Sequence, residues 1–303
     1  YHLLSKRFSF DESQLITDTL SKKMFLKIIA IRLLPLLTIV LGSLLVLRTL
    51  WSVLASRKIE WKEFKPLDLD LLDMVLLISG GFVVLGEVIS PLFSITLVES
   101  VASNLSIELT QSLKIFFGYL FMAIPPLLII YYQIKSFEKK IILKKDYFQF
   151  NFLPIKDSFF QGFKGFLMII PFVLLVSLIM NLLVDNQNGS NPLLEIVLNS
   201  NNYVSFVLLF LTTTFLAPIF EEVIFRGVLL PILSREFGII LGITISAFIF
   251  ALAHLSIGEM IPLFTLGIGL GTTRLISGRL SSSVIMHSLW NGMTFLNLFL
   301  LRT

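Results

Sequence analysis

Long apolar stretches alternate with short polar ones along most of the chain. A mixed polar segment, 1–23, is followed by eight apolar runs that are each close to the length needed to cross a bilayer. The first four are Phe25–Leu47, Leu71–Ile95, Leu113–Ile134 and Phe166–Val184, and the last four are Tyr203–Leu233, Phe237–Leu255, Ile261–Ile276 and Ser282–Leu301. The pattern predicts an all-α fold, a polytopic transmembrane helix bundle of about eight helices.

Composition supports a membrane protein and narrows its chemistry. Of the 303 residues 55% are hydrophobic and only 15% are charged, whereas a soluble domain has about a quarter charged residues. The chain has no cysteine, which excludes disulfides, thiolate metal sites and cysteine nucleophiles. The net charge of +4 lies mostly in loops, so it does not indicate nucleic-acid binding, and we expect membrane lipids as partners and no nucleic acid.

Charged residues alternate between successive loops. Loops after the odd-numbered runs are basic and contain Arg48, Arg57, Lys58, Lys62, Lys65, Lys135, Lys139, Lys140, Lys144, Lys145, Lys156, Lys164, Arg235, Arg274 and Arg279. Loops after the even-numbered runs contain Glu99, Glu108, Asp185, Glu195 and Glu259, and no Lys or Arg. The positive-inside rule places the odd loops in the cytoplasm and both termini on the other side. The N-terminal arm opposes this assignment with Lys6, Arg7, Lys22 and Lys23.

The Asn- and Gly-rich loop at 185–202 separates the first four runs from the last four and is the best internal boundary. We therefore predict a polar arm at 1–23, membrane helices of unknown role at 24–190, and a functional core at 191–303. No internal repeat is visible, which disfavours a transporter.

The fifth run contains three charges, Glu221, Glu222 and Arg226. A charged side chain at mid-membrane depth costs roughly 2.5–3.5 kcal/mol on insertion scales, so such residues are functional candidates. Glu222 and Arg226 share a helix face at spacing i,i+4 and can pair. Glu221 is rotated about 100° away and is free to act as a general base. The alternative is a purely structural ion pair between helices.

Two further pairs at spacing i,i+4 follow. Phe250 and His254 place an aromatic ring beside an imidazole, and His287 and Asn291 place two hydrogen-bonding groups on one face. The second pair suits oxyanion stabilisation, or a metal ligand with a polar neighbour. The alternatives are a satisfied core histidine and an interhelical polar contact.

Other catalytic arrangements are missing from this half of the chain. Asp is absent from the last hundred residues, so no Ser–His–Asp triad is possible there, and no HExxH zinc helix occurs. The glycines of the seventh run, Gly267, Gly269 and Gly271, are typical of helices whose backbones approach closely.

The motifs EExxxR (Glu221, Glu222, Arg226), FxxxH (Phe250, His254) and HxxxN (His287, Asn291), in this order, resemble the CPBP (CAAX protease and bacteriocin-processing, or Abi) family. This family includes the type II CAAX prenyl endopeptidase, and the resemblance covers roughly Phe206–Leu301. It implies an intramembrane endopeptidase with a peptide or membrane-protein substrate or partner, in which Glu221 and His254 activate water, and His287 and Asn291 stabilise the oxyanion.

The resemblance gives Glu222, Arg226 and Phe250 supporting roles. It leaves the cofactor open between no metal and a Zn²⁺ ion held by Glu221, His254 and His287.

Three expectations concern the site as a whole. Helix rise places Glu221 and His287 toward the cytoplasmic half and His254 toward the far side, so convergence requires a shifted or tilted helix. The cavity is expected to face the cytoplasm, in a bacterial inner or internal membrane. The rival hypothesis is a non-catalytic scaffold or assembly factor, in which the first four helices face a partner, including Glu87 buried in the second, and the Glu221 cavity is plugged.

Overall fold

The computed structural model describes residues 33–55, 59–62, 69–102, 105–138, 153–183 and 202–301, together with Lys22, Phe25 and Ile29. The N-terminal arm and almost all of the predicted boundary loop lie outside these residues, so the proposed division into segments stays a prediction. The described ranges form eight continuous helices and contain no strand, which confirms the all-α bundle.

Two of these helices combine α-helical and wider π-helical (η) stretches. The first four comprise α2 (Leu34–Leu54), then α3 (Leu71–Leu76), η2 (Leu77–Ile89) and α4 (Ser90–Val101) in one helix, then α5 (Ile107–Glu138) and α6 (Ile155–Leu183). The fifth helix joins α8 (Tyr203–Leu211), η3 (Thr212–Leu216), α9 (Ala217–Glu222), η4 (Val223–Leu229) and α10 (Leu230–Phe237). The last three are α11 (Ile239–Ala253), α12 (Met260–Ser277) and α13 (Leu280–Leu301).

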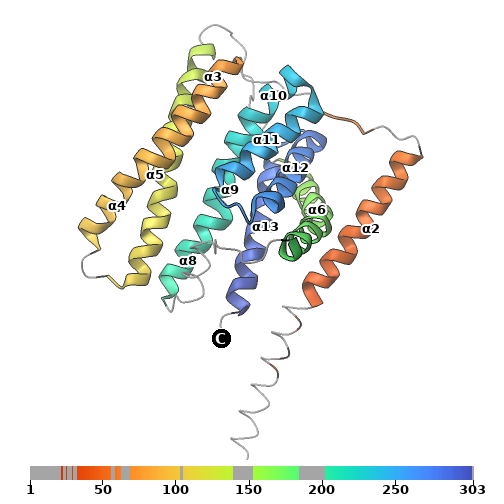
Figure 1. Cartoon of the computed structure of the whole chain (residues 1–303), viewed down its shortest axis with the longest axis horizontal. Coiled ribbons are helices and arrows are strands. Elements are labelled where there is room, and N and C mark those ends of the chain that lie inside the picture. Colours follow the sequence, from red (N-terminus) through yellow and green to blue (C-terminus); the bar gives the residue numbers. More distant parts are fainter. Residues whose placement is uncertain are drawn as a thin grey trace, which may run out of the picture.

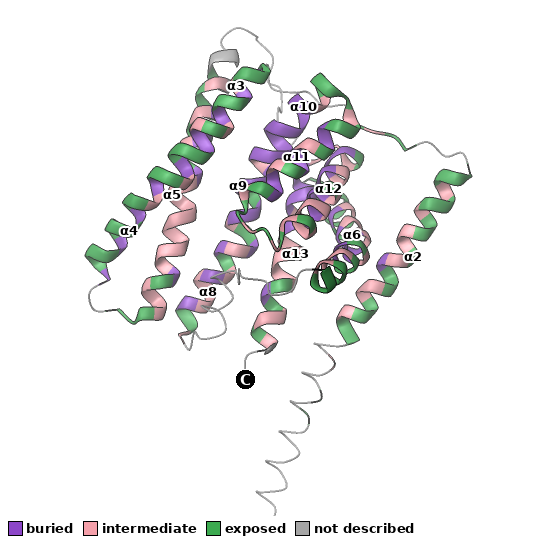
Figure 2. Ribbon diagram, in the orientation of Figure 1, coloured by how far each residue is buried: buried purple, intermediate pink, exposed green. Residues whose placement is uncertain are grey.

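Six of the described helices are long and apolar enough to cross a membrane. Many large apolar side chains on the outer helices are exposed, such as Leu54 and Leu92, and Figure 2 shows this along α2 and α4. A lipid environment explains these surfaces, because lipid covers them at no hydrophobic cost. The chain is therefore a multi-pass integral membrane protein.

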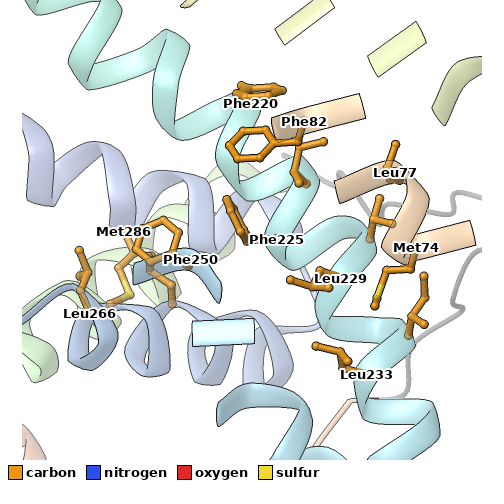
Figure 3. Packing of buried hydrophobic residues seen from close by; sticks show 14 of the residues in the cluster. Met74, Leu77, Phe82, Phe220, Phe225, Leu229, Leu233, Phe250, Leu266 and Met286 are labelled. Carbon is orange, nitrogen blue, oxygen red and sulfur yellow. The ribbon is translucent and has the colours of Figure 1, made fainter. Parts of the chain in front are cut away.

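The α8–α10 helix runs through the middle of the molecule (Figure 1). On one side α11, α12 and α13 pack against it, with α6 packed behind them on α12 and α13, and on the other side lie η2 and α5. Figure 3 shows the core between them, where the Phe82 ring lies 5.8 Å from Phe220 and 5.9 Å from Phe225. These rings fix the Glu-bearing segment of the central helix between two layers of helices.

Glycines on α12 allow the close approach that the sequence predicts. A Cβ added at Gly267 would lie 2.9 Å from the Cβ of Ala247 on α11, and one at Gly269 would lie 2.7 Å from Ile169 on α6. Gly271 is different, since its added Cβ would make only ordinary contacts of 3.4 Å or more. The prediction is confirmed at the first two positions.

Candidate active site

A buried ion pair forms the inner part of the site. Arg226 donates from Nη1 to Oε1 of Glu222 at 2.8 Å, as the i,i+4 spacing predicts, and from Nη2 to the carbonyl of Gly267 at 3.2 Å. The guanidinium also lies 4.3 Å from the centre of the Phe250 ring. Both charged side chains are inaccessible to solvent. Arg226 therefore ties the central helix to α11 and α12 at the level of the site.

The same glutamate orients His287. Nδ1 of His287 lies 3.0 Å from Oε1 of Glu222. Because a carboxylate only accepts, this contact assigns the proton to Nδ1. Nε2 then points at Glu221, 3.8 Å from Oε2.

His254 approaches Glu221 from a different helix. Its Nδ1 lies 2.8 Å from the carbonyl of Phe250, which accepts, so Nδ1 carries the proton and Nε2 is the free acceptor. Nε2 lies 3.9 Å from Oε2 of Glu221. The structure thus brings the carboxylate of Glu221 to the Nε2 atoms of two imidazoles.

The expected difference in depth between Glu221 and His254 was wrong. The central helix and α11 form a hairpin about Gly238, whose φ is 84°. Glu221 lies 17 residues before this turn and His254 lies 16 after it, so both residues are about 25 Å from the turn. The apolar run in the sequence did not reveal that Glu221 and His254 lie equally far from the turn. The run is longer than α11, which has only 15 residues and ends before the far membrane surface.

Asn291 is held by a backbone carbonyl in the central helix. Its Nδ2 donates to the carbonyl of Thr213 at 2.9 Å. At the end of the π-helical stretch η3, the backbone amide of Ala217 donates to the carbonyl of Thr212, five residues earlier. The next amide would belong to Pro218, which has none, so the Thr213 carbonyl is left for a side chain. The second hydrogen of the Asn291 amide is available to other acceptors.

A cavity of about 460 Å³ adjoins these residues. Glu221, His254 and Asn291 line it, whereas His287 lies behind Glu221 with 2% of its surface exposed. Oε2 of Glu221 has no hydrogen-bond partner among the described residues. An unpaired carboxylate oxygen at the cavity floor is placed to act on a small molecule or substrate group there.

The cavity faces the opposite end of the bundle from the one expected. Its lining comes from the second half of α6, the start of α12 and Trp290–Leu298 of α13; from there α6 and α12 lead to acidic connections and α13 leads to the C-terminus. In Figure 1 this is the end that carries the start of α8 and the C-terminus. The expectation of a cavity toward the basic loops is therefore wrong.

Sequence reasoning missed several wall residues. Ser177 and Asn181 of α6 and Tyr119 of α5 line the cavity, although these helices carry no recognisable motif. Only their place in the bundle brings them to the site. Glu87, expected to be buried, is half-buried on η2.

The donor types at the site suit zinc, but their arrangement does not form a ligand set. Zn²⁺ binds imidazole nitrogen and carboxylate oxygen at about 2.0–2.2 Å in tetrahedral geometry. Among the described residues no group of three or more His, Asp or Glu side chains could hold a metal ion. We assign no ligand set and derive no metal-dependent step.

Comparison with known proteins agrees with the motifs. Residues 203–293 match the family model described as type II CAAX prenyl endopeptidase Rce1-like. No curated protein and no solved structure matches the chain. The family match confirms the CPBP resemblance over the C-terminal third and contains all seven motif residues.

Proposed function

Because residues 203–293 are similar to the type II CAAX prenyl endopeptidases, we propose that this multi-pass membrane protein is an intramembrane endopeptidase. The observation that carries the proposal is the Glu221 carboxylate, which stands in a cavity between the Nε2 atoms of His254 and His287. The membrane we propose is a bacterial inner or internal one, and the substrate is a peptide or membrane-protein segment.

Glu221 is the proposed general base. Its Oε2 is 3.9 Å from one imidazole and 3.8 Å from the other, beyond direct hydrogen bonding but within reach of one bridging water. Nε2 of His254 accepts a hydrogen bond from this water and Oε2 of Glu221 takes its proton. A positioned base of this kind contributes about 10²–10⁴-fold to the rate.

The reaction is a hydrolysis in two steps. The water oxygen forms a bond to the carbonyl carbon of the scissile peptide as its proton moves to Glu221, and the carbonyl electron pair becomes an oxyanion. The oxyanion then collapses, the carbon–nitrogen bond breaks, and the proton on Glu221 moves to the leaving amine. One carboxylate thus acts first as base and then as acid.

His287 and Asn291 are the proposed oxyanion donors. Nδ1–H of His287 is held by Glu222 and Nε2 faces Oε2 of Glu221 behind the cavity wall, so in this role Nε2 must carry a proton and reach the oxyanion past Glu221. The remaining N–H of the Asn291 amide is the second donor. Fixed donors in a site shielded from water stabilise an oxyanion more than water does.

The scaffold alternative has no observation in its favour. It expects the Glu221 cavity to be filled and Glu87 to be buried, whereas Glu221 and His254 both reach a cavity.

The proposal is tested with purified protein in proteoliposomes and a pool of membrane-anchored peptides, with cleavage read by mass spectrometry. We expect cleavage by the wild type and none by Glu221→Gln. Glu236→Gln is the matched control, because Glu236 is exposed on the same helix and pairs with Arg235 away from the cavity. The proposal is overturned if the wild type cleaves no peptide while a CAAX endopeptidase assayed beside it cleaves its own substrate.

A further inference from the structure

We infer that the cavity opens on the non-cytoplasmic side of the membrane and receives polypeptide segments presented from that side. The direction of opening stands on the geometry and charge of the chain alone. The nature of the occupant, a polypeptide to be cleaved, rests on the proposed function.

The described segments of the cavity wall lie toward one end of the bundle, and we call the opening at that end the mouth. The cavity is lined by Val173–Asn181 of α6, Pro262–Leu266 of α12 and Trp290–Leu298 of α13. Each of these stretches lies in the part of its helix nearest the acidic connections. Among the described residues no lining residue comes from the first half of α6 or from α13 before Trp290.

The α11–α12 hairpin is recessed at this mouth. α11 has 15 residues and is about 22 Å long, whereas the hydrocarbon core is about 30 Å thick. The irregular connection 254–259 therefore lies within the membrane. Non-helical backbone at that depth is tolerated only where it is buried in protein or lines a water-filled cavity.

This connection is not buried in protein. Leu255 and Ile257 are 84% and 88% exposed, and Gly258 and Glu259 line the cavity. Gly258 and Glu259 therefore meet this condition by lining the cavity, which water enters from the nearer membrane surface, whereas the exposed apolar side chains of Leu255 and Ile257 suit contact with lipid.

Among the described residues the opposite end of the molecule is closed. The segment 59–62 crosses it, where the amide of Lys62 donates to the carbonyl of Leu275 at 3.0 Å and Trp61 packs against the buried Leu230. Arg235 donates to the carbonyl of Leu69 at 2.7 Å. Between this end and Glu221 the central helix is sealed by side chains without solvent exposure, such as Leu229.

Charge identifies the closed end as cytoplasmic. α2 and α5 end on this side, and the sequence that follows each of them is basic, with Lys62 after α2 and a lysine-rich stretch after α5. The connections at the mouth contain acidic residues and no Lys or Arg. Because short basic loops stay in the cytoplasm, the mouth faces the other side. The basic arm before α2 is outweighed by the basic loops at the closed end.

The absence of cysteine from the chain makes the test direct. Single-cysteine variants are made at the mouth (Ile257→Cys), in the cavity wall (Ser177→Cys) and at the closed end (Lys62→Cys). Small charged, membrane-impermeant thiol reagents are applied to intact cells and to inverted membrane vesicles. Thr294→Cys is a second wall probe in case Ser177→Cys does not fold.

We expect the mouth and wall cysteines to label in intact cells, and Lys62→Cys to label only in inverted vesicles. The inference is overturned if the mouth and wall cysteines label only in inverted vesicles, or if the wall cysteine labels from the same side as Lys62→Cys. Labelling needs no catalysis, so this result is independent of whether the protein cleaves peptides.

Discussion

At the scale of single residues the site is a compact set of charges buried in a membrane protein. Glu222 accepts from both Arg226 and His287, which leaves Glu221 uncommitted to the ion pair. Placing two carboxylates side by side in a membrane is unfavourable without compensating cations. Arg226 and His287 supply that compensation, so one carboxylate is structural and the other is available for chemistry.

A double-mutant cycle tests the structural role of Glu222. Glu222→Gln or Arg226→Met alone leaves the other buried charge of the pair without its partner. Each substitution is expected to lower the free energy of unfolding by about 3–5 kcal/mol. The double variant removes both charges and should lose much less than the sum of the single losses. Thermal unfolding in detergent, calibrated by denaturant unfolding, measures the four proteins. Additive losses would contradict the account.

Residue spacing predicted side-chain pairs well and backbone partners not at all. The Glu222–Arg226 contact follows from i,i+4 geometry. The carbonyls of Gly267 and Thr213, which bind Arg226 and Asn291, could not be predicted, because every residue has a carbonyl. Which carbonyl is unpaired depends on helix geometry around Pro218 and on close helix contact at Gly267.

At the scale of helices, Pro218 and Asn291 are expected to be coupled. Asn291→Ala leaves the Thr213 carbonyl without a donor and should cost about 1–3 kcal/mol of stability. Pro218→Ala restores a backbone amide that can bond to this carbonyl, so Asn291→Ala should cost less in that background. The coupling is measured by unfolding of the four variants, and equal costs in both backgrounds would argue against the assignment.

Contact between α11 and α12 is tested by a matched pair of glycines. Gly267→Ala places a Cβ 2.9 Å from that of Ala247 and should cost about 1–3 kcal/mol through overpacking. Gly271→Ala meets only ordinary contacts and should be neutral or slightly stabilising, since Ala favours helix. Equal effects of the two substitutions on unfolding would show that close packing at Gly267 does not position α11.

Helix number could be predicted from hydropathy, but helix depth could not. The apolar run Phe237–Leu255 suggests a full span, whereas α11 covers only Ile239–Ala253. The chain reverses at Leu255, which has a φ of 51°, a left-handed conformation uncommon for a non-glycine residue. This shortening, with the hairpin about Gly238, brings His254 to Glu221.

At the scale of the whole molecule, the cavity opens at one end of the helix bundle, and the described residues close the other end. The core around Phe82, Phe225 and Phe250 (Figure 3) separates the polar site from the basic end. Figure 2 shows that burial is greatest along α9–α12 and falls toward the outer helices. The rigid central helix therefore presents Glu221 to a cavity whose walls come partly from helices outside the family match, such as α6.

The most direct test of the central claim is co-purification from native membranes of the wild type beside Glu221→Gln, with bound partners and peptide products read together by mass spectrometry. The account predicts a partner that accumulates intact only on Glu221→Gln, and its cleaved form only with the wild type. If the same intact partner stays bound to both proteins and no product forms, Glu221 does not activate water for hydrolysis and the polar cluster is architectural.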